Sequence, residues 1–201
     1  MSAPDGRGSP RIAVVAHEAS GDDQRSLSAA ERARAAAMGL RRRRRFVVAR
    51  TAARSMLAEE LGILPAEVAL VDDGPRPTLA ASAGGPPWAL SISHGRGVSV
   101  VVLSRRAVGV DLEPVVAGAY DPDVARRVLH PDERRWIEGE ADRDLGFLAC
   151  WTRKEAVAKL RGTGLDDEAA AWAATPTPPG IELRELDVAP GHVCSLAMAA
   201  G

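Results

Sequence analysis

The amino-acid sequence predicts an α+β protein made of two halves with the same order of elements. Each half has one short apolar run, then helical segments, then two apolar runs that can pair as a hairpin. The single runs are residues 11–16 and 107–112, and the paired runs are 88–93 with 98–104 and 181–188 with 193–199. The halves share a pattern without visible sequence identity. We expect two similar halves packed side by side with a cleft between them.

The composition limits the classes of protein to which the chain can belong. Of its 201 residues 46% are hydrophobic and 3% aromatic, so the core must consist mainly of Ala, Val and Leu. The net charge of −1 at pH 7 argues against a protein that binds nucleic acid through its overall charge. Cys150 and Cys194 lie in apolar surroundings without a ligand motif, and we expect buried thiols in a reducing compartment.

The same patterns predict the boundaries of the chain's parts. Residues 1–10 are rich in Gly, Pro and Ser with no apolar run after them, which predicts a disordered tail and no signal peptide. No apolar stretch approaches the ~20 residues of a membrane-spanning helix. We expect a cytoplasmic protein that binds neither membrane nor nucleic acid, with an N-terminal half at 11–104 and a C-terminal half at 105–201.

Several helix starts carry recognisable caps. Ser28 with Glu31 forms a capping box that begins the first helix. Pro131, followed by acidic residues, begins a helix over 131–139, after an earlier helix over 121–128. A final helix is expected from about residue 144 to residue 161.

Arg41–Arg45 is a run of five arginines at the start of a helix expected over residues 42–61. Consecutive helical residues are about 100° apart, so the five side chains cannot all face one ligand. The run is a solvated helix end, or one or two of its arginines meet a phosphate together with Arg50 or Arg54. A third alternative is a nuclear-localisation or nucleic-acid-binding segment, which no second basic cluster or aromatic platform supports.

Two turns of the first half present polar side chains. Gly74-Pro75-Arg76-Pro77 is a rigid turn that presents one guanidinium. His94-Gly95-Arg96-Gly97 is a four-residue hairpin loop, with His94 at the end of a strand. His94 is either bonded locally within the turn or exposed to a ligand above the sheet edge.

Three carboxylates and a lysine of the second half can gather at one place. Asp111 and Glu113 are two apart on a strand, so they project together, and a divalent cation is the usual reason for such a pair. Trp151, Glu155 and Lys159 are four apart on the last helix and share a face. Taken alone, the strand carboxylates could equally be an exposed acidic strand end, and the helix residues could equally be a surface ion pair. Trp151 is expected to pack the helix against the sheet.

Taken together, these residues predict chemistry on a phosphate. Three carboxylates with water suit Mg²⁺, which prefers oxygen ligands and commonly bridges substrate phosphates. Lys159 with one or two arginines would meet the remaining phosphate charge. We therefore predict phosphoryl-type transfer from a diphosphate substrate.

Two motifs of this region resemble the signature of the 4′-phosphopantetheinyl transferases. They are the strand Val108-Gly109-Val110-Asp111-Leu112-Glu113, and the helix Trp151-Thr152-Arg153-Lys154-Glu155-Ala156 with Lys159 and Gly162-Thr163-Gly164-Leu165. The chain length and a Leu-Ser-x-x-Glu-Arg segment at Leu27 are similar to the surfactin-type subgroup, in which one chain forms a pseudo-dimer of two α+β halves. The resemblance runs from about Leu27 to Leu196 and implies the 4′-phosphopantetheinyl transferase fold.

The resemblance implies an enzyme of the holo-[acyl-carrier-protein] synthase type. It would transfer 4′-phosphopantetheine from coenzyme A to a serine of an apo acyl or peptidyl carrier protein and release adenosine 3′,5′-bisphosphate. Coenzyme A would bind with Mg²⁺, or Mn²⁺ in its place, between the halves of a monomer. Carriers of fatty-acid, polyketide and nonribosomal-peptide synthesis all present such a serine.

The resemblance also implies roles for individual residues. Asp111, Glu113 and Glu155 would be the metal ligands, and Glu155 or a metal-bound water would take the proton of the serine. Lys159 would stabilise the phosphate under attack, with Lys154 as a further contact. Ser93, His94 and Arg45 would meet the 3′-phosphate of coenzyme A, and Arg76 would line the adenine side.

The first half departs from the family pattern at several positions. Pro75 is inserted before Arg76, Ser91 stands where the family has Asn, and Gly95 stands where it has a hydroxyl residue. The alternative to an enzyme is a non-catalytic paralogue that binds coenzyme A or a carrier protein. The complete set of carboxylates with Lys159 favours the enzyme.

Overall fold

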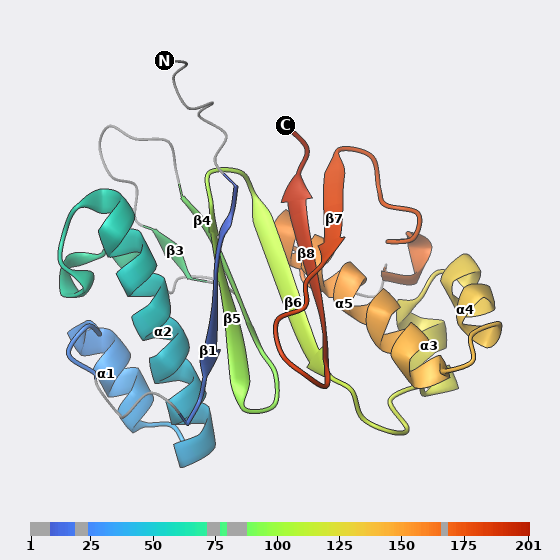
Figure 1. Ribbon diagram of the computed structural model, residues 1–201, viewed down its shortest axis with the longest axis horizontal. Helices are drawn as coiled ribbons and strands as arrows, with labels where there is room; N and C mark the ends of the chain where they lie inside the picture. The colour runs from blue at the N-terminus through green and yellow to red at the C-terminus, as the bar shows by residue number, and fades with distance from the viewer. Residues whose placement is uncertain (1–8, 19–23, 72–76, 80–87, 166–168) are drawn as a thin grey trace. The chain divides into compact units, whose positions relative to one another are not determined.

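The computed structural model describes residues 9–18, 24–71, 77–79, 88–165 and 169–201. The chain divides into two compact units, Met1–Arg106 together with Gly201, and Ala107–Ala200. Each unit has its own three-stranded antiparallel sheet with helices (Figure 1). The predicted α+β class is therefore confirmed. None of the helices within the described ranges has the length and apolar character needed to cross a bilayer.

The sheet of the first unit has the order β1-β5-β4. Its strands are β1 (Arg11–Ala16), β4 (Ala89–His94) and β5 (Val98–Ser104). The central strand β5 is buried along its whole length, as its valine-rich sequence favours. A second, two-stranded sheet pairs β2 (Leu70–Val71) with β3 (Thr78–Leu79), after the short 3₁₀ helix η1 (Pro65–Glu67).

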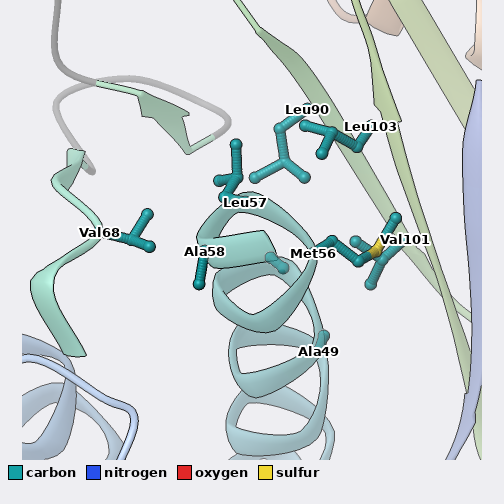
Figure 2. Close-up of a cluster of buried hydrophobic side chains, with 9 residues drawn as sticks. Ala49, Met56, Leu57, Ala58, Val68, Leu90, Val101 and Leu103 are labelled. Carbon is teal, nitrogen blue, oxygen red and sulfur yellow. The ribbon is translucent and has the colours of Figure 1, made fainter. Parts of the chain in front are cut away.

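Two helices belong to the first unit, α1 (Ala29–Ala36) and α2 (Leu40–Leu61). The capping box of Ser28 and Glu31 forms as predicted at the start of α1. Helix α2 packs on β4 and β5 through a cluster of buried apolar side chains. Figure 2 shows Met56 beside Val101 and Leu57 beside Leu90, with Val68 on the other side of the helix.

A buried ion pair joins the two helices of the first unit. Arg54 is 1% exposed, and its Nε donates to Glu31 Oε2 at 2.7 Å. Its Nη1 donates to the main-chain oxygens of Pro65 and Val68. Arg50 is also buried, with Nη1 3.6 Å from Glu31 Oε1. The proposed partnership of Arg50 or Arg54 with a phosphate is thus wrong, because both side chains lie inside the unit.

The sheet of the second unit has the order β6-β8-β7. Its strands are β6 (Val108–Pro114), β7 (Ile181–Glu185) and β8 (His192–Ala199). In both three-stranded sheets the last strand is the central one. It pairs with the first strand on one side and with the strand that precedes it in sequence on the other. The two predicted hairpins are therefore confirmed. The helices are α3 (Pro122–Val128), α4 (Pro131–Glu138) and α5 (Arg143–Arg161), with a 3₁₀ turn η2 (Ala169–Ala171).

Two element boundaries differ from the predictions in ways that affect the candidate site. Strand β6 continues to Pro114, because Glu113 and Pro114 still pair with Val193 and His192 of β8. The carboxylates of Asp111 and Glu113 therefore project from within a strand. Helix α2 begins at Leu40, which places the arginine run in its first two turns.

Candidate active site

Helix α5 lies directly against strands β6 and β8 of the second unit (Figure 1). Gly109 allows this close approach. A Cβ atom at Gly109 would lie 2.0 Å from the main-chain oxygen of Ala156 and 2.4 Å from the main-chain nitrogen of Leu160. Since residues two apart on a strand share a face, Asp111 and Glu113 project on the same side as Gly109, toward α5.

A second contact fixes the rotation of α5 on the sheet. Ser195 of β8 lies opposite Asp111 in the strand register. Its hydroxyl is 2.9 Å from the hydroxyl of Thr152 on α5, and both side chains are buried. The contact at Gly109 and this hydrogen bond together hold the face of α5 with Glu155 and Lys159 beside the strand carboxylates.

Lys159 and Asp111 form the central ion pair of the site. Lys159 Nζ donates to Asp111 Oδ1 at 2.6 Å. The Asp111 side chain is 5% exposed and that of Lys159 is 28% exposed, so the pair stands at the edge of the interior. The Lys159 side chain is therefore partly accessible to solvent.

Glu113 stands on the same strand face in a more open position. Burial raises the pKa of Glu113 above its usual value, and the negative charge of Asp111 raises it further. A hydrogen bond from the Trp151 side chain and the charge of Lys159 act in the opposite direction. Trp151 also packs on Phe147, with ring centroids 5.9 Å apart. Trp151 therefore holds Glu113 in addition to its predicted packing role.

Glu155 completes the acidic group from the helix side. Burial raises its pKa, Asp111 raises it further, and Lys159 lowers it. The three carboxylates thus feel one another's charge, with Lys159 as the shared cation. Such a group makes charge neutralisation by a cation favourable.

The donor chemistry suits a divalent cation, because the three side chains offer only oxygen ligands, which Mg²⁺ prefers. The arrangement in the described part of the chain, however, contains no group of three or more His, Cys, Asp or Glu side chains that could hold a metal ion together. The Lys159 ammonium is bonded to Asp111 instead. The assignment of Asp111, Glu113 and Glu155 as metal ligands stays a prediction.

Lys154 lies in the interior and not at the site. Its side chain is fully buried, and Nζ is 3.1 Å from Oε2 of the fully buried Glu133. Nζ also donates to the main-chain oxygen of Trp172 and lies 4.2 Å from the centroid of the Trp172 ring. The predicted contact of Lys154 with coenzyme A is therefore corrected to an internal ion pair, since no part of the side chain is open to a ligand.

Glu133 connects three segments of the second unit through this pair. Its Oε2 accepts a hydrogen bond from His130 N at the start of α4, and its Oε1 accepts one from Ala174 N at 2.7 Å. Burial lowers the pKa of Lys154, and the charge of Glu133 opposes this shift. The pair thus ties α4 and the segment around Trp172 to α5.

The first unit holds the residues predicted to meet the 3′-phosphate. Arg45 is exposed on α2, His94 is half-buried at the end of β4, and Ser93 is 5% exposed. Ser93 and His94 are neighbours on a strand, so their side chains leave opposite faces and do not form one pocket wall. Arg76 lies outside the described residues.

Sequence reasoning missed two residues of these sites. Gly109 was visible in the strand motif, but its partner atoms belong to a helix almost fifty positions later. His17 follows β1 directly, and its Nε2 is 2.9 Å from the Ser99 hydroxyl, which is also 2.7 Å from His94 Nδ1. A single polar residue after an apolar run was the only signal for it.

In the second unit, a helix packed on an antiparallel sheet places a lysine beside carboxylates of a strand. The sequence model of the 4′-phosphopantetheinyl transferase superfamily matches residues 107–192. The 4′-phosphopantetheinyl transferase AcpT of Salmonella typhi is 30% identical over 147 residues, which are 72% of this chain and 74% of AcpT. The chain therefore belongs to the 4′-phosphopantetheinyl transferases.

Two further relatives match over a smaller share of their own length. The 4′-phosphopantetheinyl transferase HetI of Nostoc sp. is 29% identical over 142 residues, 68% of this chain and 60% of HetI. A candidate 4′-phosphopantetheinyl transferase of Synechocystis sp., slr0495, is 31% identical over 129 residues, 61% of this chain and 51% of that protein. The chain thus spans between half and three fifths of these two relatives.

Proposed function

We propose that the protein transfers 4′-phosphopantetheine from coenzyme A to a serine of an apo acyl or peptidyl carrier protein, with release of adenosine 3′,5′-bisphosphate. The observation that carries this proposal is the Lys159–Asp111 pair, with Glu113 and Glu155 beside it on α5 and β6. Family membership supports it. We further propose the surfactin-type arrangement, a monomeric pseudo-dimer, on the ground that both units have the same strand order.

Asp111, Glu113 and Glu155 would hold Mg²⁺ in this proposal. The ion would supply positive charge that neutralises the diphosphate of coenzyme A. Lys159 Nζ donates to Asp111 Oδ1, so an ion held by Asp111 would compete with the lysine for this carboxylate. A Lys159 displaced in this way would have its ammonium available for the phosphate.

The residues of α5 then have separate tasks. Lys159 donates hydrogen bonds to the phosphate oxygens and stabilises the charge that grows on them during attack. Glu155, whose pKa is raised by burial, accepts the proton of the incoming serine hydroxyl at a carboxylate oxygen. Trp151 keeps Glu113 oriented through its hydrogen bond. The nucleophile is supplied by the carrier protein.

In the first unit we propose that Arg45, Ser93 and His94 serve the 3′-phosphate end of coenzyme A, and that Arg76 serves its adenine. Arg45 lies on the exposed face of the first turns of α2, where it can reach an anion in solution. Ser93 is mostly buried and leaves the strand on the face opposite His94, so its contribution would be separate from that of His94.

The alternative function is a non-catalytic paralogue that binds coenzyme A or a carrier protein. The observation that favours it is that the described carboxylates do not assemble a metal-holding group. It predicts coenzyme A binding by calorimetry without transfer to any carrier. The raised pKa values of Glu113 and Glu155 favour the enzyme, because burial and then the charge of Asp111 raise them, and carboxylates perturbed in this way cluster at functional sites.

The experiment is an assay of the full chain with Mg²⁺, coenzyme A and a panel of apo carrier proteins, followed by intact mass. We expect a carrier whose mass rises by one phosphopantetheine group. Asp111→Ala should abolish the transfer, whereas Asp132→Ala, which removes an exposed carboxylate of α4, should leave it unchanged. Normal activity of Asp111→Ala would overturn the metal assignment. Coenzyme A binding without transfer to any carrier would establish the alternative.

A further inference from the structure

A hollow of about 760 Å³ opens on the first unit between the start of α2, the end of β1 and the β4–β5 turn. Its lining includes five arginines and one glutamate, Glu18. Four of the arginines come from α2, namely Arg41, Arg42, Arg44 and Arg45, and the fifth is Arg96 of the turn. This excess of guanidinium groups favours a ligand with several negative charges.

His17 is the imidazole on the wall of this hollow. Its main-chain nitrogen donates to the Gly97 oxygen at 2.9 Å, which fixes the end of β1 against the turn. Burial lowers the pKa of His17, and the nearby positive charge of Arg45 lowers it further. The lowered pKa favours the neutral imidazole, which has one N–H group to donate.

Ser99 connects His17 with His94. It lies on the central strand β5 with no exposed surface, so it cannot contact a ligand itself. Its hydroxyl is 2.9 Å from His17 Nε2 and 2.7 Å from His94 Nδ1. A hydroxyl has a single proton to donate, so at least one of these ring nitrogens must donate to Ser99. The orientation and the tautomer of the two rings are thus linked.

We propose that His17 is a further contact of the protein for a terminal phosphate monoester, and that Ser99 is the positioning residue that orients His17 together with His94. This inference rests on the proposed function, because the monoester would be the 3′-phosphate of coenzyme A. The arginines of α2 supply charge, which attracts any polyanion. With Nε2 accepting from Ser99, the neutral His17 ring carries its N–H at Nδ1 and can direct it at the monoester, which favours the monoester over the same ligand without it.

The test is calorimetric titration of the full chain with coenzyme A and with 3′-dephospho-coenzyme A, which differ only in the monoester. We expect the unaltered protein to prefer coenzyme A. His17→Ala should weaken coenzyme A binding about tenfold, the size expected for one hydrogen bond to a charged group, and leave dephospho-coenzyme A within about twofold. His17→Gln, which keeps an N–H donor, should retain part of the preference.

Ser99→Ala and His192→Ala serve as the matched variants. Ser99→Ala should reduce the preference several-fold although the residue is buried, because both rings lose their shared partner. His192→Ala removes an imidazole from the second unit and should leave the preference unchanged. Thermal unfolding of each variant shows whether it is folded.

Each outcome separates this inference from the proposed function. A preference that His17→Ala leaves intact, or an equal loss for both ligands, overturns the role of His17. Equal affinity of the unaltered protein for both ligands overturns the monoester site alone. Failure to bind either ligand overturns the proposed function along with it.

Discussion

Lys154 and Lys159 lie on one helix, five residues apart, and have opposite environments. Five helical steps turn the side chain by about 140°, so the two ammonium groups cannot face one phosphate. Lys154 is fully buried against Glu133, and Lys159 reaches Asp111 at the edge of the interior. The helical period alone was sufficient to separate them, but the resemblance had grouped both with coenzyme A. The partner Glu133 could not be predicted, because it belongs to a different helix.

The reactivity of Cys150 and Cys194 tests, at the residue scale, whether the interior of the second unit is closed to solvent. Burial raises the pKa of each thiol to about 12. At pH 8 only about one thiol in ten thousand is then ionised, and the thiolate is the reactive form. We therefore expect neither cysteine to be alkylated by iodoacetamide in the folded protein. Intact mass measures this, and a sample in guanidinium chloride should react at both positions. Alkylation of the folded protein would show that these thiols are open to solvent.

The elements were predictable where a local pattern determines them. The capping box of Ser28 and Glu31 is a local signal, and the structure confirms it. Strand β6 extends past the predicted end because Glu113 pairs with Val193 of β8, some eighty positions along the chain. The position of α5 on the sheet depends on Gly109 and on the Thr152–Ser195 hydrogen bond, which are tertiary contacts that no local pattern contains.

Gly109→Ala is the sharpest test at the element scale. The added Cβ would overlap main-chain atoms of α5, which cannot move without shifting the helix. We expect the free energy of unfolding to fall by about 3 kcal/mol or more, and the proposed transferase activity to fall with it, because Glu155 and Lys159 move away from β6. Denaturant unfolding and the carrier assay measure the two effects.

Gly139→Ala is the matched control for this test. It lies in the same unit with φ −84°, and its nearest contact for an added Cβ is at 3.4 Å. We expect a change of less than about 1 kcal/mol. Equal effects of the two substitutions would show that the contact of Gly109 with α5 is unimportant.

At the scale of the whole molecule, the sequence predicted a repeated pattern and the structure shows one strand order in both units. That prediction was based on the hydrophobic pattern of the sequence, because both hairpins consist of apolar runs with short connections. The composition of the interior was less predictable. Arg54, Lys154 and Glu133 are among the largest fully buried side chains, and charged residues are expected at the surface unless a partner is known.

Arg54→Leu tests whether the units unfold independently. The substitution leaves the Glu31 carboxylate buried without its closest cation, which costs about 3 to 5 kcal/mol. Because Arg54 connects only elements of the first unit, we expect faster amide hydrogen exchange in residues 9–106 and little change in α5, β6 and β8. Arg11→Ala breaks an exposed pair with Glu60 in the same unit and should cost less than about 1 kcal/mol. Equal acceleration in both units would show that they unfold together.

The capping box of α1 has a consequence for anyone who engineers this protein. Glu31 Oε2 accepts from Ser28 N and also from Arg54 Nε, so one oxygen begins a helix and neutralises a buried charge. Glutamine is the usual substitute for glutamate in a capping box. A stabilisation design that ranks substitutions by how often residues occur at helix starts would accept Glu31→Gln. This substitution would remove the negative charge that neutralises Arg54. Position 31 should therefore be excluded from such libraries.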